Sequence, residues 1–215
     1  MVHYIEKLIR EGEHQQQDFK FCITDSRKIA KSLSAFANTD GGRLLIGVKD
    51  NGKIAGTKVD EEFHMIQAAA EMYSKPKIEF ESKVWTVHGK NVLEITIEPS
   101  SNMPHYAQNE NGKWLAYVRK DDENKLANRI LLEVWKRKSK PTGTYLEYTE
   151  TESVLLEHLK INENISLNKF CKLAKISRYK AERILVKLIC WEVLEPNFEE
   201  KGTSYKLKQV ESNSI

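Results

Sequence analysis

The spacing of hydrophobic residues predicts alternating helices and strands in the first 140 residues. Apolar residues at positions 5, 8 and 9 follow the i, i+3, i+4 spacing of a short helix. Phe19 and Phe21 alternate with polar neighbours, as in a half-buried strand. Further predicted elements are a helix with the apolar stripe Ile29, Leu33, Phe36 and Ala37, strands over residues 43–48, 78–87, 92–97 and 114–119, and helices over residues 61–72 and 127–138. This order predicts an α+β fold in which helices pack on a mixed β-sheet.

A segment that contains Pro141 and Gly143 marks the predicted domain boundary and gives domains over residues 1–140 and 141–215. Beyond it the apolar spacing becomes mainly helical. The elements predicted there are helices over residues 150–159, 167–173 and 177–190 and strands over residues 193–195 and 204–207. Three helices followed by a two-stranded ribbon form the winged helix-turn-helix plan, so we expect a small domain of this kind at the C-terminus.

The last of these helices has a basic face. The whole chain has 34 basic and 31 acidic residues, but between Ser166 and Cys190 seven basic residues accompany a single acid, Glu182. On a helical wheel Ala181, Ile184, Leu185, Leu188 and Ile189 fall within about 140° on one side. The outer side offers cations for phosphates and for guanine edges. The residues expected to contact nucleic acid are Arg178, Tyr179, Lys180, Arg183 and Lys187. The alternative is a solvated helical face used for dimerisation or for contact with another protein.

Three acids in the first part are candidates for metal-assisted chemistry. Asp18 lies on the first predicted strand on the same face as Lys20, Glu13 comes five residues earlier, and Asp50 begins an Asp-Asn-Gly turn that leads into residues 53–56. If the three carboxylates converge, they would hold Mg²⁺ or Mn²⁺ and activate water on a phosphodiester, with Lys20 neutralising the developing charge. The alternative is that these are surface acids and a hairpin aspartate without chemistry.

Several segments resemble the Schlafen AlbA-type domain between about Tyr4 and Asn128. The segments are Glu13-x-x-x-x-Asp18-Phe19-Lys20, Ser34-Ala35-Phe36-Ala37-Asn38-Thr39-Asp40-Gly41-Gly42, Leu45-Ile46-Gly47-Val48-Lys49-Asp50-Asn51-Gly52-Lys53-Ile54-Ala55-Gly56, Met103-Pro104-His105-Tyr106 and Ala116-Tyr117-Val118-Arg119. The resemblance implies a nucleic-acid-binding domain of DNA-binding or transcription-regulating type. In bacteria and archaea this domain is often followed by a winged helix.

The resemblance also implies an alternative, a metal-dependent endoribonuclease acting on tRNA or other structured RNA. The RNA-cleaving animal Schlafens use three acids, and the matching positions here are Glu13, Asp18 and Asp50. The second acid of the family is usually the longer Glu, whereas this chain has Asp18. Those nucleases also pair two such domains in one chain, so a homodimer would have to supply the second half.

The remaining features narrow the expected partners and compartment. Arg43 and Arg119 border predicted strands, where phosphate contact or ion pairing is expected. Gly42-x-x-x-x-Gly47 flanks a strand instead of opening a helix and is followed by Val48-Lys49, which excludes an ATP-binding phosphate loop. The histidine spacings favour no metal site.

Three cysteines without a C-x-x-C pair favour a reducing cytosol, and no apolar run is long enough to span a membrane. We therefore expect a cytoplasmic DNA-binding regulator without a cofactor, with RNA as the alternative partner and a homodimer as a candidate assembly.

Overall fold

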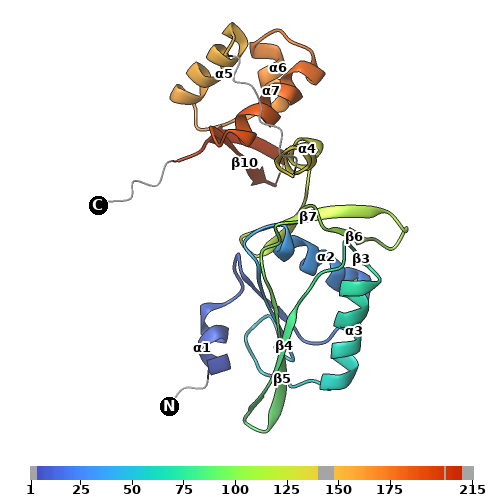
Figure 1. Cartoon of the computed structure of the whole chain (residues 1–215). Coiled ribbons are helices and arrows are strands. Elements are labelled where there is room, and N and C mark those ends of the chain that lie inside the picture. The colour runs from blue at the N-terminus through green and yellow to red at the C-terminus, as the bar shows by residue number, and fades with distance from the viewer. Residues whose placement is uncertain (1–3, 140–147, 201, 210–215) are drawn as a thin grey trace. The chain divides into compact units, whose positions relative to one another are not determined.

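The computed structural model describes residues 4–139, 148–200 and 202–209, and the chain divides into the units Met1–Ala127 and Asn128–Ile215 (Figure 1). This division precedes the boundary expected after residue 140. The reason is helix α4 (Arg129–Lys138), whose apolar residues Ile130 and Val134 belong to the core of the second unit. The expected boundary segment, which contains Pro141 and Gly143, lies outside the described residues.

The first unit contains two four-stranded sheets. One sheet has the strand order β1-β2-β5-β4 and the other has the order β3-β6-β7-β8. The strands are β1 (Gln17–Lys20), β2 (Gly42–Ile46), β3 (Ser74–Lys75), β4 (Glu81–Val87), β5 (Lys90–Ile97), β6 (Tyr106–Gln108), β7 (Trp114–Lys120) and β8 (Glu123–Leu126). The helices are α1 (Tyr4–Glu11), α2 (Ser26–Ala37) and α3 (Val59–Glu71).

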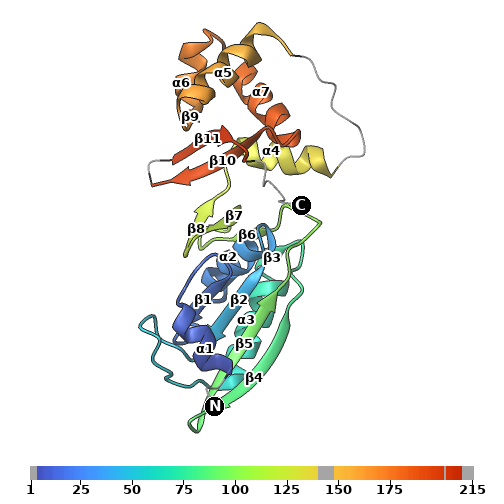
Figure 2. The same cartoon turned by 90° about the vertical axis from the view of Figure 1, so that its left-hand side faces the viewer.

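Helices cover both faces of the first sheet (Figures 1 and 2). Strand β1 runs parallel to β2, and the β2–β5 and β5–β4 pairs are antiparallel, so the sheet is mixed as expected. Because side chains alternate along a strand, Phe19 and Leu45 face α1, whereas Leu44 packs with α2 and α3. Helix α2 also packs against β6 and β7 of the second sheet. Both sheets therefore share α2 as a common support.

The Asn38–Gly42 segment joins these layers. The side chain of Asn38 donates to the carbonyls of His105 and Tyr117 at 2.8 and 3.0 Å, and its Oδ1 accepts from the His105 amide at 2.7 Å. A Cβ on Gly41 would lie 2.7 Å from the carbonyl oxygen of Ile97, and one on Gly42 would lie 2.4 Å from the ring of Phe36. The most specific part of the family-like motif therefore has a structural role between α2, β5 and β6.

The second unit has a helix-turn-helix with a ribbon. It comprises α4, α5 (Glu150–Ile161), β9 (Ile165–Ser166), α6 (Leu167–Leu173), α7 (Arg178–Cys190), β10 (Leu194–Glu199) and β11 (Gly202–Leu207). Strands β10 and β11 form an antiparallel ribbon, and β9 adds to β11. Buried residues of all these helices pack around α7, including Leu155, Phe170 and Leu185. The arrangement is consistent with a winged helix, so the α+β fold with a C-terminal domain of this type is confirmed.

Three details differ from the sequence-based elements. The strands β3, β6 and β8 have only two to four residues, too few for a recognisable alternation. They form a second sheet instead of extending the first one. Residues 53–56 make only an isolated bridge from Ile54 to Val48, because the amides of Ala55 and Gly56 both turn toward the carbonyl of Gly47.

Among the described helices, none has the length and apolarity to cross a membrane.

Candidate nucleic-acid interface

The N-terminal half of α7 presents the exposed part of the predicted basic face. The helix begins after Ser177, whose hydroxyl accepts from the amide of Lys180 at 3.3 Å. Tyr179 is 64% exposed, and Lys180 and Arg183 are also exposed. The guanidinium of Arg183 lies 5.8 Å from the ring centre of Tyr179. Neither Lys180 nor Arg183 has an ion pair with an acid among the described residues, so no carboxylate of this part of the chain competes for them.

The C-terminal half of the same face is covered. Val186, on the outer side of the wheel, is only 2% exposed, because Ile130 and Val134 of α4 pack into the same core. A hollow of about 390 Å³ remains between α4 and α7, and Arg137 and Arg183 are among its lining residues. A second hollow, of about 720 Å³, lies between α7 and the start of α5. The exposed cations therefore stand beside grooves and not on a smooth helix surface.

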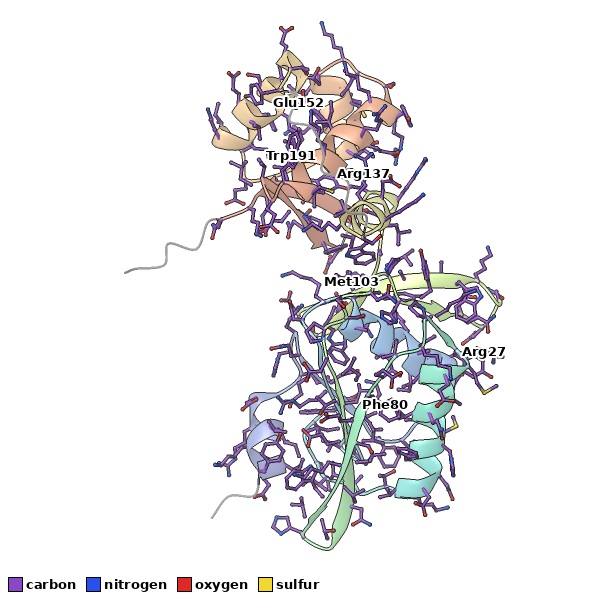
Figure 3. All side chains as sticks on the ribbon, in the orientation of Figure 1. Arg27, Phe80, Met103, Arg137, Glu152 and Trp191 are labelled. Carbon is purple, nitrogen blue, oxygen red and sulfur yellow. The ribbon has the colours of Figure 1, made fainter. Side chains whose placement is uncertain are left out.

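Lys187 and Arg178 are held by acids of the same unit. Lys187 is 15% exposed in its side chain, and its Nζ lies 3.2 Å from Glu152 of α5 (Figure 3 labels Glu152). Burial alone would raise the pKa of Glu152, but hydrogen bonds from Thr149 and Lys187 outweigh burial and hold that pKa below its usual value. Arg178 pairs with Glu182 at 3.1 Å on the helix surface. Lys187 thus joins α7 to α5. Of the cations expected to contact nucleic acid on α7, only Lys180 and Arg183 have no acidic partner among the described residues.

Glu13 and Asp18 of the first unit lie together. Glu13 accepts a hydrogen bond from the amide of Phe19 at 2.9 Å, and Asp18 is 4% exposed. Lys20 and Arg119 approach the Asp18 carboxylate at 2.9 and 3.7 Å. Burial, and then the hydrogen bond shared with Asp18, raise the pKa of Glu13 to about 7. The Glu13 carboxyl therefore takes up a proton at a higher pH than an ordinary glutamate does.

The third acid is placed elsewhere. Asp50 is exposed in the turn that follows the Val48 bridge, whereas Asp18 pairs with Leu44 within the sheet. In the described ranges, no group of three or more His, Cys, Asp or Glu side chains is arranged to hold a metal ion. The structure brings together two of the three acids predicted for a Mg²⁺ or Mn²⁺ site, and Asp50 does not join them.

The cations expected on the sheet domain are also engaged. The side chain of Arg119 is 1% exposed, and its Nη2 donates to the carbonyl of Gln17 at 3.1 Å, so it is buried below Asp18. Arg43 donates to the hydroxyl of Tyr4 at 3.1 Å and lies 3.9 Å from the buried Glu94. Lys20, which pairs with Asp18, also donates to a backbone carbonyl at 2.7 Å. Burial removes Arg119 from the accessible surface, and the ion pairs leave Lys20 and Arg43 weaker candidates for phosphate contact.

The structure instead shows a basic group on α2 that the sequence analysis missed. Arg27, Lys28 and Lys31 lie on the first two turns of this helix and line a hollow with Tyr117 of β7. The i, i+1, i+4 spacing of these cations on a helix was the available signal. This signal is weak, because the three residues are not part of the family-like motif and the apolar stripe of the helix defines only its buried face.

Comparison with known proteins identifies the first unit. The family model described as Schlafen, AlbA_2 matches residues 13–128, which is more than half of the chain. None of the curated proteins compared with the chain matches it. Among solved structures, the DIP2311 protein of Corynebacterium diphtheriae has a TM-score of 0.42 and 20% identity over 57% of this chain, which spans 28% of that protein. The N-terminal domain of a RecG-related protein of Nitrosomonas europaea has a TM-score of 0.40 and 18% identity, over 69% of this chain and 98% of that domain.

Proposed function

This chain belongs to the Schlafen AlbA_2 family, and from that premise we propose that it is a nucleic-acid-binding protein that contacts duplex DNA through α7 as a transcriptional regulator. The family suggests a DNA-binding, regulator-like domain. The helix-turn-helix of α6 and α7 and the β10–β11 ribbon support the same assignment, because such domains dock the second helix in the major groove.

One observation favours α7 as the contact. Its N-terminal half exposes Tyr179, Lys180 and Arg183, while the opposite side is the core of the unit. The N-terminal residues of a recognition helix are those that reach base edges and phosphates. Since Lys180 and Arg183 have no acidic partner among the described side chains, their charge remains available to a polyanion.

No specific observation favours the endoribonuclease alternative. It needs the carboxylate of Asp50 beside those of Glu13 and Asp18, and the described geometry joins only the latter two. The alternative of a protein-interaction domain predicts that the α7 cations are dispensable for nucleic-acid affinity.

The test compares the full chain with two double variants in fluorescence anisotropy, using a labelled mixed-sequence duplex at low salt. Lys180→Gln with Arg183→Gln removes two charges from α7, and we expect it to weaken binding about tenfold or more. Lys136→Gln with Lys160→Gln removes two exposed charges of the same unit that line neither hollow, and we expect a change below about twofold. Equal affinities of the two variants, or no binding by the unmodified chain, would reject the proposal.

A further inference from the structure

The first unit has a basic surface that its ion pairs do not neutralise. Arg27, Lys28 and Lys31 of α2 have no acidic partner among the described residues. Instead, the guanidinium of Arg27 lies 4.7 Å from the ring centre of Tyr73, and the Nζ of Lys31 lies 5.2 Å from that of Tyr117. A cation held over an aromatic ring keeps its charge and its N–H donors, unlike a cation in an ion pair. Figure 3 labels Arg27 at the surface of this unit.

These cations are placed against the preference of their own helix. The first turn of α2 contains no acid, although the positive end of the helix dipole disfavours cations there. Only the N-cap Asp25 compensates, by accepting from the amide of Arg27 at 2.8 Å. Arg27 and Lys28 in this first turn therefore cost stability locally, and departures of this kind are expected where a surface serves function.

A hollow of about 190 Å³ opens beside the cations. The β6–β7 hairpin forms its other wall with the polar side chains of Gln108, Asn109 and Asn111 and with the exposed acid Glu110, so three cations face one acid here. Asn109 uses its Oδ1 to accept from the amides of Asn111 and Lys113 at 3.0 and 2.9 Å, which fixes the turn. Amide side chains beside cations can bind a phosphodiester and the sugar that follows it.

A stacking surface lies on the same hairpin. Trp114 of β7 is 40% exposed and is the cross-strand partner of Gln108. Directly opposed residues of an antiparallel pair project from the same face, so the indole lies beside Gln108, on the face of β7 opposite to Tyr117, and a strand that leaves the hollow reaches it around the hairpin. Every base can stack on an exposed indole, but only when the base is not stacked within a duplex.

We propose that α2 and the β6–β7 hairpin bind a single-stranded nucleic acid, with phosphates on Arg27, Lys28 and Lys31 and a base stacked on Trp114. The inference rests on the proposed nucleic-acid binding and adds a second substrate class to it. Duplex DNA contacts α7 of the second unit, and the unpaired strand binds the first unit. DNA and RNA strands share this chemistry, and comparison of the two strands distinguishes them.

The test measures binding of the full chain to labelled oligo-dT and oligo-rU. Arg27→Gln with Lys28→Gln and Lys31→Gln should weaken binding at least tenfold, and should lower the slope of log K against log salt by about 2, since each single-strand contact contributes about 0.7. Lys7→Gln with Arg10→Gln and Lys53→Gln removes three exposed charges elsewhere on this unit and should leave both quantities unchanged. Urea midpoints of the α2 variant should equal or exceed those of the unmodified chain, because removing these cations favours the helix dipole.

Stacking is tested separately. Trp114→Ala should weaken binding to oligo-dT about tenfold, and Trp114→Phe should restore most of it, because a phenyl ring still stacks. Four results would overturn the inference: no single-strand binding by the unmodified chain, equal loss in the α2 and control variants, no rescue by phenylalanine, or equally tight binding of an oligo-glutamate peptide. None of these results would affect the proposal that α7 binds duplex DNA. That proposal is tested separately, by the duplex affinity of the Lys180→Gln with Arg183→Gln variant.

Discussion

Replacing Asn38 by alanine tests how the first unit holds its two sheets together. Asn38 is 4% exposed, and its side chain satisfies the amide of His105 and the carbonyls of His105 and Tyr117. The hydroxyl of Ser34 also donates to the His105 carbonyl at 2.8 Å, so that acceptor keeps a partner in the variant. The His105 amide and the Tyr117 carbonyl each lose their bond to residue 38. At about 1–3 kcal/mol for each buried group, the expected cost is about 3 kcal/mol.

Amide hydrogen exchange measured by mass spectrometry reports this cost locally. A loss of about 3 kcal/mol should accelerate exchange in peptides covering β6 and β7 by about 100-fold. Asn102→Ala, at an exposed position near the same strand, should change exchange by less than about threefold. Acceleration below about tenfold in Asn38→Ala would refute the claim that this motif residue joins α2 to the second sheet.

Three further substitutions separate structural from contact roles. Burial raises the pKa of Glu13 to about 7 from 4.5, so the unmodified chain should lose stability as pH rises between these values. Glu13→Gln should abolish that decline in urea midpoints, and parallel pH curves of the two proteins would contradict the raised pKa of Glu13. Lys187→Met should lower the unfolding free energy of the second unit by about 1–2 kcal/mol, because Glu152 loses its cationic partner and keeps only Thr149, without changing duplex affinity. Arg119→Met should cost about 3–5 kcal/mol in urea denaturation, and a stable variant with weakened DNA binding would instead make Arg119 a contact.

Much of the fold was predictable because its long elements have clear periods. The stripe of α2 and the core positions of α7 follow helical spacing and are buried as expected. The strands β3, β6 and β8 were not predictable, because their pairing depends on partners far along the chain. The placement of α4 in the second unit was missed for a related reason: a Pro-Gly segment ends a helix, but it does not determine which core the helix joins.

The candidate sites were predictable only as residue types. Sequence spacing indicated that the cations of α7 share a side, and Lys180 and Arg183 are exposed there. It could not show that Glu152 of α5 engages Lys187, since that ion pair joins residues 35 positions apart. Similarly, Arg119 ends beneath Asp18 because β7 meets α2 and β1 in space, a juxtaposition that has no local signal.

The salt dependence of duplex binding tests the central claim most directly. The claim is that Lys180 and Arg183, exposed on the N-terminal half of α7, contact the DNA backbone. Each phosphate contact with duplex DNA contributes about 0.9 to the slope of log K against log salt. The account predicts that Lys180→Gln with Arg183→Gln lowers the magnitude of this slope by about 1.8, whereas Lys136→Gln with Lys160→Gln leaves it unchanged. An identical slope for the α7 variant and the unmodified chain would contradict the account.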